Sequence, residues 1–299
     1  MAVNISSIVP HLWFDTKALE AASFYTSLFP GSQIISKTRI ENTPSGDVDI
    51  LTFALNGQKF MAIDAGPLFR FNDSISFFVY CSSESEINRL YEKLSENGSV
   101  LMPLGKYDWS RKYAWIRDKY GLSWQLDVED IRSSQKILPS LLFVNEKSTR
   151  VREAVEFYSS VFPDSGVIME APYDKTTSMP DGSLLFAQFR LSGFLFNAMS
   201  STLHHDYDFN ESVSFMVYCD TQEEIDYYWE KLKEGGEEQQ CGWIKDKFGV
   251  AWQIVPTEMV EMMSTTNKDQ LASVTSEMLK MVKLDIKALR NAYNFLSRK

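Results

Sequence analysis

Two glutamines occupy matching places in the chain and are the first side chains with chemistry to explain. Gln125 lies in the segment WIRDKYGLSWQLDV and Gln253 in WIKDKFGVAWQIVP, with Trp, Asp, Gly, Trp and Gln at the same spacing. Each amide stands among apolar residues, so burial would oblige it to find hydrogen-bond partners. Two roles stay open for each amide: it ties neighbouring strands together, or it binds a ligand.

A second set of residues with binding chemistry precedes the first motif. The segment 100–114, VLMPLGKYDWSRKYA, mixes cations and aromatic rings, among them Trp109 and Arg111, and the second copy of the motif is preceded by a shorter segment. A flap of this composition would attract an anionic ligand to a cavity. An ordinary surface loop of the same composition is the alternative.

Three further side chains belong to the candidate set. Trp13 and Trp124 stand on apolar segments and form either core or the wall of a ligand cavity. His11 is a lone imidazole near the start of an apolar segment, where a hydrogen bond to Gln125 or to the backbone would satisfy it.

The composition limits the classes of partner that the chain is expected to bind. The chain has 299 residues and a formal net charge of −10, which argues against nucleic acid and anionic membrane as partners. No run approaches the roughly 20 apolar residues of a membrane span, and no basic region precedes an apolar stretch at the N-terminus. Three widely spaced cysteines, without a CxxC motif, favour a reduced, cytoplasmic protein.

Internal similarity organises the elements that must position these residues. The matching segments are Pro10–Ser32 with Pro139–Ser165, and Asn72–Gly98 with Asn210–Gly236. The sequence therefore predicts two copies of one unit, at residues 1–130 and 136–256. A C-terminal helical extension follows at 257–299, where methionines recur at helical spacing; it either packs on the second copy or offers a groove to a partner.

Each copy is predicted to be α+β, with two βαβββ modules. Short apolar segments such as HLWF predict strands, and KALEAASFYTSLF places its apolar residues on one helical face. Asn56-Gly57 between two alternating segments predicts a hairpin. The whole chain is therefore predicted to contain four modules.

The paired modules, with Gly-x-x-Trp-Gln on the last strand of each copy, resemble the vicinal oxygen chelate superfamily (glyoxalase, bleomycin resistance and dioxygenase proteins). Within it the chain is similar to the PhnB-like, or demethylubiquinone-methyltransferase-like, family. The resemblance rests on HLWFDTKALEAASFYTSLFPGS, LMPLGKYDWSRKYAWIRDKYGLSWQL and their second copies, and it extends into the C-terminal tail. It implies two tandem glyoxalase-like domains, each with two βαβββ modules around a cup-shaped cavity, plus the helical extension.

The resemblance also implies a divalent metal in the cup of the first domain, held by side chains of the first and last strands of each module. Carried over to this sequence, the metal positions are His11, Asp64 and Gln125, with Ala62 in place of Asp64 if the fourth strand shifts by two residues. Ser74 takes the fifth-strand position. The corresponding second-copy residues include no histidine and no carboxylate: Ser140, Asn197 or Ser200, Ser212 and Gln253.

Two functions from different classes follow. The first is a PhnB-like protein that binds a small oxygen-rich or anionic metabolite in the first domain, with His11 and Gln125 as catalytic residues and a wall formed by Trp13, Ser74, Trp109, Arg111 and Trp124. The alternative is a non-catalytic assembly or scaffold module, with modules paired within one chain or between two chains of a homodimer. A glycine-rich nucleotide motif is absent from the sequence, so methyl transfer finds no support there.

Overall fold

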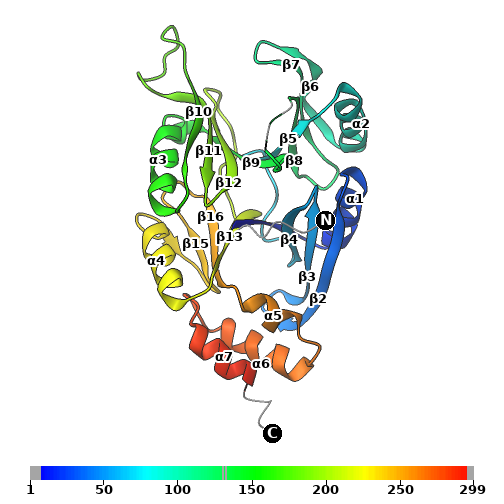
Figure 1. Ribbon diagram of the computed structural model, residues 1–299, viewed down its shortest axis with the longest axis vertical. Coiled ribbons are helices and arrows are strands. Elements are labelled where there is room, and N and C mark those ends of the chain that lie inside the picture. The colour runs from blue at the N-terminus through cyan, green and yellow to red at the C-terminus, as the bar shows by residue number, and fades with distance from the viewer. Residues whose placement is uncertain (1–7, 130, 132, 295–299) are drawn as a thin grey trace.

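The computed structural model describes residues 8–129, 131 and 133–294, so residues 1–7, 130, 132 and 295–299 of the predicted units lie outside the described part. The fold is α+β and is built on two eight-stranded sheets, one above the other in Figure 1. Within the described residues, no helix is both long and apolar enough to span a membrane.

Each sheet combines one module of each copy. The first sheet has the strand order β14-β15-β16-β13-β1-β4-β3-β2 and the second has the order β10-β11-β12-β9-β5-β8-β7-β6. The strands of the first sheet are β1 (Ile8–Phe14), β2 (Gln33–Thr43), β3 (Gly46–Leu55), β4 (Gln58–Asp64), β13 (Val213–Cys219), β14 (Glu237–Glu238), β15 (Trp243–Lys245) and β16 (Ala251–Pro256). Those of the second sheet are β5 (Ile75–Cys81), β6 (Ser99–Tyr107), β7 (Ser110–Arg117), β8 (Ser123–Val128), β9 (Ile137–Phe143), β10 (Gly166–Pro172), β11 (Leu184–Leu191) and β12 (Phe194–Ser200). The sequence left open whether the modules pair within one chain or between two chains. In this structure they pair within one chain.

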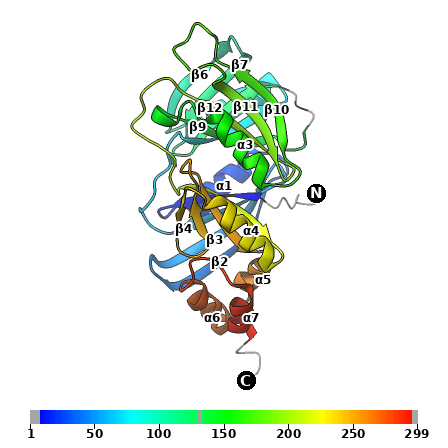
Figure 2. The same cartoon turned by 90° about the vertical axis from the view of Figure 1, so that its left-hand side faces the viewer.

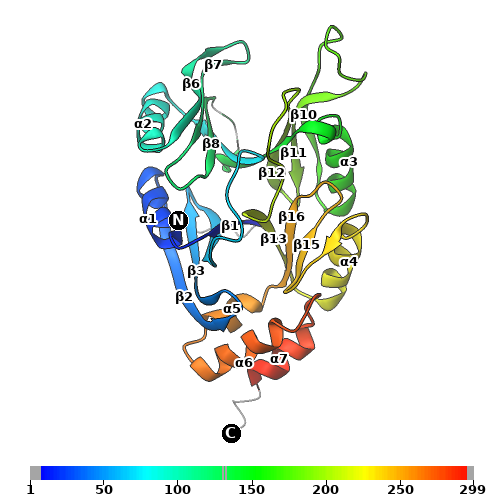
Figure 3. The same cartoon turned by 180° about the vertical axis from the view of Figure 1, so that it is seen from behind.

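The helices cover the sheets in a matching pattern. The helices are α1 (Ala18–Leu28), α2 (Glu84–Ser95), α3 (Val151–Val161), α4 (Gln222–Leu232), α5 (Met259–Ser264), α6 (Lys268–Met278) and α7 (Ile286–Asn294), with a short 3-10 turn, η1 (Asn145–Lys147). Helices α1 and α4 contact the first sheet, and α2 and α3 contact the second. Figures 1 and 3 show α1 and α2 on one side of the molecule and α3 and α4 on the other.

Antiparallel junctions join the two copies. Strand β1 pairs with β13, and β5 pairs with β9. Just beyond each junction, the Trp13 amide donates to the Ser212 carbonyl at 2.8 Å, and the Leu142 amide donates to the Ser74 carbonyl at 2.7 Å. The two contacts are equivalent, so the copies are related by an approximate twofold arrangement.

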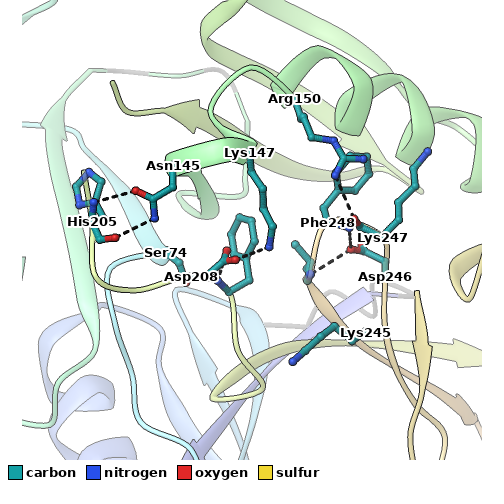
Figure 4. Close-up of polar contacts among 12 residues, drawn as sticks. Ser74, Asn145, Lys147, Arg150, His205, Asp208, Lys245, Asp246, Lys247 and Phe248 are labelled. Carbon is teal, nitrogen blue, oxygen red and sulfur yellow. Dashed lines mark hydrogen bonds and ion pairs between the residues drawn. The ribbon is translucent and has the colours of Figure 1, made fainter. Parts of the chain in front are cut away.

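The repeated Trp–Asp–Gly–Trp motif forms a buried turn that fixes the last hairpin of each copy. Asp246 accepts hydrogen bonds from the Trp252 indole at 2.8 Å and the Tyr158 hydroxyl at 2.7 Å. Its other carboxylate oxygen accepts the amides of Phe248 at 2.9 Å and Val250 at 3.1 Å. Figure 4 shows this turn with Asp246 and Phe248 at its centre. Because four donors converge on one carboxylate, the spacing of the motif is a structural requirement.

The first copy contains the same arrangement. Asp118 accepts from the Trp124 indole at 2.8 Å and from the Tyr25 hydroxyl at 2.7 Å. Gly121 has a φ of +89°, a left-handed conformation that favours glycine. Trp124 is fully buried in the main hydrophobic core, so this predicted cavity-wall residue is a core residue.

We expect Tyr158→Phe and Tyr25→Phe each to lower the free energy of unfolding by about 1–3 kcal/mol, because each removes a donor to a buried carboxylate. Urea unfolding followed by circular dichroism measures the loss. Tyr227→Phe is the control: Tyr227 is an exposed residue whose hydroxyl donates to a backbone carbonyl, and the expected loss is below about 0.5 kcal/mol. Equal losses in all three variants would contradict this assignment.

Candidate functional site

A cavity of about 360 Å³ lies on the face of the first sheet opposite α1 and α4. Residues of β1, β3, β4, β13, β15 and β16 form its floor, and the β2–β3 hairpin forms one side. Helices α5 and α6 of the C-terminal extension complete the lining; Figures 1 and 2 show the extension at the end of this sheet. The first and last modules of the chain therefore share one cavity.

The extension is attached to both copies. The Met281 carbonyl accepts from the Cys241 amide at 2.8 Å, next to β15. Helix α5 contacts β16 and helix α6 contacts β2. The tail thus packs on the first copy as well as on the second, and it covers the cavity between them.

Two residues of the cavity floor, His11 and Gln253, are linked by the fully buried Ser214. The Gln253 amide nitrogen donates to the Ser214 hydroxyl at 2.9 Å, and that hydroxyl lies 3.4 Å from Nδ1 of His11. Because the Ser214 oxygen accepts from Gln253, its own hydrogen can be donated to Nδ1, which leaves the imidazole N–H on Nε2. In that tautomer Nε2 of His11 is a donor, and Oε1 of Gln253 is an acceptor.

Burial keeps His11 uncharged. Desolvation lowers the pKa of His11 from its usual 6.5 to about 3. The edge of the ring also meets the Trp243 ring, with centroids 5.7 Å apart. An imidazole with so low a pKa is a weak base, so it would not retain a proton taken from a substrate. The geometry therefore favours a hydrogen-bonding role for His11 over that of a general base.

The fourth strand presents a different residue from either that the sequence suggested. Strand pairing sets Met61 beside His11, and Met61 lines the cavity. Ala62 lies on the opposite face, in the main core. Asp64 accepts the Ala18 amide at 2.6 Å at the start of α1. Neither Asp64 nor Ala62 faces His11, because strand residues alternate between the two faces.

The structure does not bring Gln125 and His11 together. Gln125 belongs to the second sheet, where its Oε1 accepts from the Tyr113 hydroxyl at 2.6 Å and its Nε2 donates to Ser76 at 2.7 Å. Ser76 pairs with Ser140 as Ser214 pairs with His11, so Ser76 holds the fifth-strand position that was assigned to Ser74.

The remaining predicted wall residues lie in separate places. Trp13 lines the cavity, and its indole donates to the Gly66 carbonyl at 2.9 Å. Trp109 and Arg111 belong to the β6–β7 hairpin of the second sheet, where Trp109 is 64% exposed and stacks on Tyr107. Ser74 lies at the junction of the copies, and its hydroxyl donates to Asn72 at 2.6 Å.

Sequence reasoning missed most of the cavity residues. Met61, Lys59 and Tyr218 were not selected, nor was the buried Ser214, although the repeat had marked Gln253 as the counterpart of Gln125. The alternation of LNGQKFMAID would have placed Lys59 and Met61 on one face. The sequence does not predict which other module completes that face, because this depends on pairing between distant segments.

The comparisons with known proteins agree with this architecture. The family model described as 3-demethylubiquinone-9 3-methyltransferase matches residues 6–127 and again residues 135–255. The chain belongs to this family. A search of curated proteins gives no match.

Among solved structures, a PhnB protein from Bacillus cereus is 43% identical over 40% of this chain and 98% of its own, with a TM-score of 0.38. A protein from Staphylococcus aureus is 35% identical over 42% of this chain and 99% of its own, with a TM-score of 0.19. Glyoxalase I from Zea mays is 10% identical, with a TM-score of 0.57 over 86% of this chain and 96% of its own. The last likeness shows the fold, which is the tandem vicinal oxygen chelate fold.

The cavity floor does not fit the divalent metal that this fold implies. At the four corresponding positions stand an imidazole, a thioether, a hydroxyl and an amide, from His11, Met61, Ser214 and Gln253. Carboxylates, which would neutralise a divalent cation, are missing from this set. Within the described part of the chain, no three His, Cys, Asp or Glu side chains gather as a metal site.

We expect His11 to make folding stability depend on pH. Its folded pKa of about 3 lies below the usual 6.5, so the unfolded chain binds more protons between these values, and stability falls as the pH falls through this window. From pH 7 to pH 5 the His11 contribution is a loss of about 2 kcal/mol. Urea unfolding at both pH values should show that His11→Asn removes this part of the loss. His204→Asn, at an exposed histidine, is the control and should behave as wild type; equal pH dependence in wild type and His11→Asn would refute the assignment.

Proposed function

We propose that the first-sheet cavity binds a small, mostly apolar molecule that has one hydrogen-bonding end. The observation that carries the proposal is the cavity of about 360 Å³, with His11 and Gln253 on its floor. Ligand pockets typically span roughly 300–1,000 Å³ and combine apolar walls with a few placed polar groups. The proposal moves the ligand from the first domain, where the sequence placed it, to a cavity shared by the first and last modules.

The walls of the cavity suit an apolar ligand of variable shape. Aromatic rings of Trp13 and Trp243 stand on the floor side. Five methionines join the lining, two from the strands and three from the extension: Met61, Met216, Met259, Met263 and Met278. Unbranched thioether side chains fill irregular spaces and adapt to different ligands.

The polar end of the ligand would meet a donor and an acceptor that are linked through Ser214. Nε2–H of His11 would donate to a ligand oxygen, and Oε1 of Gln253 would accept from an N–H or O–H group. Hydroxyl, carboxyl and carboxamide groups satisfy both atoms. Binding of this kind requires no metal, and no bond-breaking step is assigned to the site.

The methyl transfer in the description of the family is not carried over to this chain, because the sequence lacks a glycine-rich nucleotide motif. The scaffold function, the homodimer and the cytoplasmic location stay predictions.

We expect 1-naphthamide, an apolar ring with one carboxamide, to bind saturably in isothermal titration calorimetry, equally well with and without a chelator. Gln253→Leu and His11→Leu should each weaken binding about tenfold, the value of one lost hydrogen bond. Gln125→Leu makes the same chemical change in the second sheet and should change the Kd less than twofold. Absence of saturable binding, or equal effects of Gln125→Leu and Gln253→Leu, would sink the proposal.

A further inference from the structure

The charge of the cavity wall is unlike that of the chain. The sequence contains 40 Asp and Glu against 30 Lys and Arg. Yet, within the described part of the chain, the residues that line the cavity include Lys59 and no aspartate or glutamate. A wall drawn at random from this composition would carry more negative than positive charge. Lys59 is therefore the cation of a lining whose described residues hold no carboxylate.

Lys59 is held in position without an acidic partner. It lies on β4 two residues before Met61, so both side chains point to the cavity face. Its ammonium group sits 4.9 Å from the ring centroid of Tyr218, whose hydroxyl contacts the sulfur of Met61 at 3.1 Å. No carboxylate in the described part of the chain forms an ion pair with Lys59.

The second sheet has no counterpart to this charge. The strand register makes Asn197 the equivalent of Met61, so Leu195 is the equivalent of Lys59. Leu195 packs in a small apolar cluster with Phe78, Tyr80 and Tyr113. The lysine is thus not a requirement of the fold, because the same strand position is filled by leucine in the other copy.

A half-buried ammonium group without a counter-ion is electrostatically unfavourable. Desolvation accordingly lowers the pKa of Lys59. The Tyr218 ring offsets part of this cost through a cation–π contact. A negatively charged ligand group would offset more, because two opposite charges attract strongly at a partly dehydrated site.

Building on the proposed function, we infer that the ligand of the first-sheet cavity carries an anionic group, such as a carboxylate, that pairs with Lys59. The ligand is then an apolar carboxylic acid in its ionised form. Lys59 selects the charge, and the apolar walls bind the rest of the molecule. The anionic ligand that the sequence suggested from the Trp109–Arg111 segment would thus bind at a cation on a different strand.

The test compares 1-naphthoate with 1-naphthamide, which share one ring and differ in charge. In isothermal titration calorimetry of the full chain, we expect wild type to bind the carboxylate about tenfold more tightly than the amide at low ionic strength. Lys59→Met keeps a similar apolar stem and should remove this preference while leaving the Kd for the amide within about twofold. Lys59→Glu should reverse the preference.

Lys280→Gln is the matched control for net charge. Lys280 is exposed and pairs with Glu277 on the surface, so its loss should leave the preference unchanged. Equal binding of the two compounds by wild type, or a preference that persists in Lys59→Met, overturns the charge assignment and leaves the proposed function standing. Absence of binding of both compounds overturns the proposed function and this inference with it.

Discussion

The structure depends on hydrogen bonding along the first strands of the modules. Strand β1 pairs with β4 on one side only, and its other side carries backbone groups that need partners if they are buried. The chain satisfies these groups with β13 of the second copy, and it satisfies β5 with β9 in the same way. One copy alone would leave both edges open. The pairing between copies is therefore the condition for both sheets.

This junction also decides which side chains meet on the cavity floor. In the antiparallel register His11 stands opposite Ser214. Strand β16 runs beside β13, so Gln253 joins them from the second copy. A residue of the first copy and two of the second thus form one polar group. The site is a product of the assembly of the two copies and belongs to neither alone.

The two copies share the buried turns that hold their last hairpins, and they differ in the residues at the floor positions of the two sheets. The buried carboxylates Asp118 and Asp246 hold equivalent turns in both copies, with equivalent tyrosine and tryptophan donors. On the floors, the positions of His11 and Met61 in the first sheet correspond to Ser140 and Asn197 in the second. The Asp and the second Trp of the repeated motif are therefore structural, while its Gln has a different neighbourhood in each sheet.

Local patterns made the elements predictable, and long-range pairing limited the rest. Helix periodicity, the Asn56-Gly57 turn and the repeat were enough for the modules, because these signals act over a few residues. The meeting of His11 with Gln253 could not be predicted, because it depends on a junction between strands about 200 residues apart. At Asp64 the limit was register: the odd-numbered residues of β4 face the cavity, so a shift of one residue selects Met61 instead of Ala62.

The electrostatics of the floor explain why this cup needs no metal to balance its charge. Carboxylates on the floor would stabilise a protonated imidazole and raise its pKa. Here desolvation lowers the pKa of His11 to about 3. The thioether of Met61 and the amide of Gln253 keep the floor neutral, so a cation is not needed to balance it. The charge in the lining is instead the ammonium of Lys59 at the wall. A ligand of the proposed kind would supply the negative charge that carboxylates supply to a metal in a chelating cup.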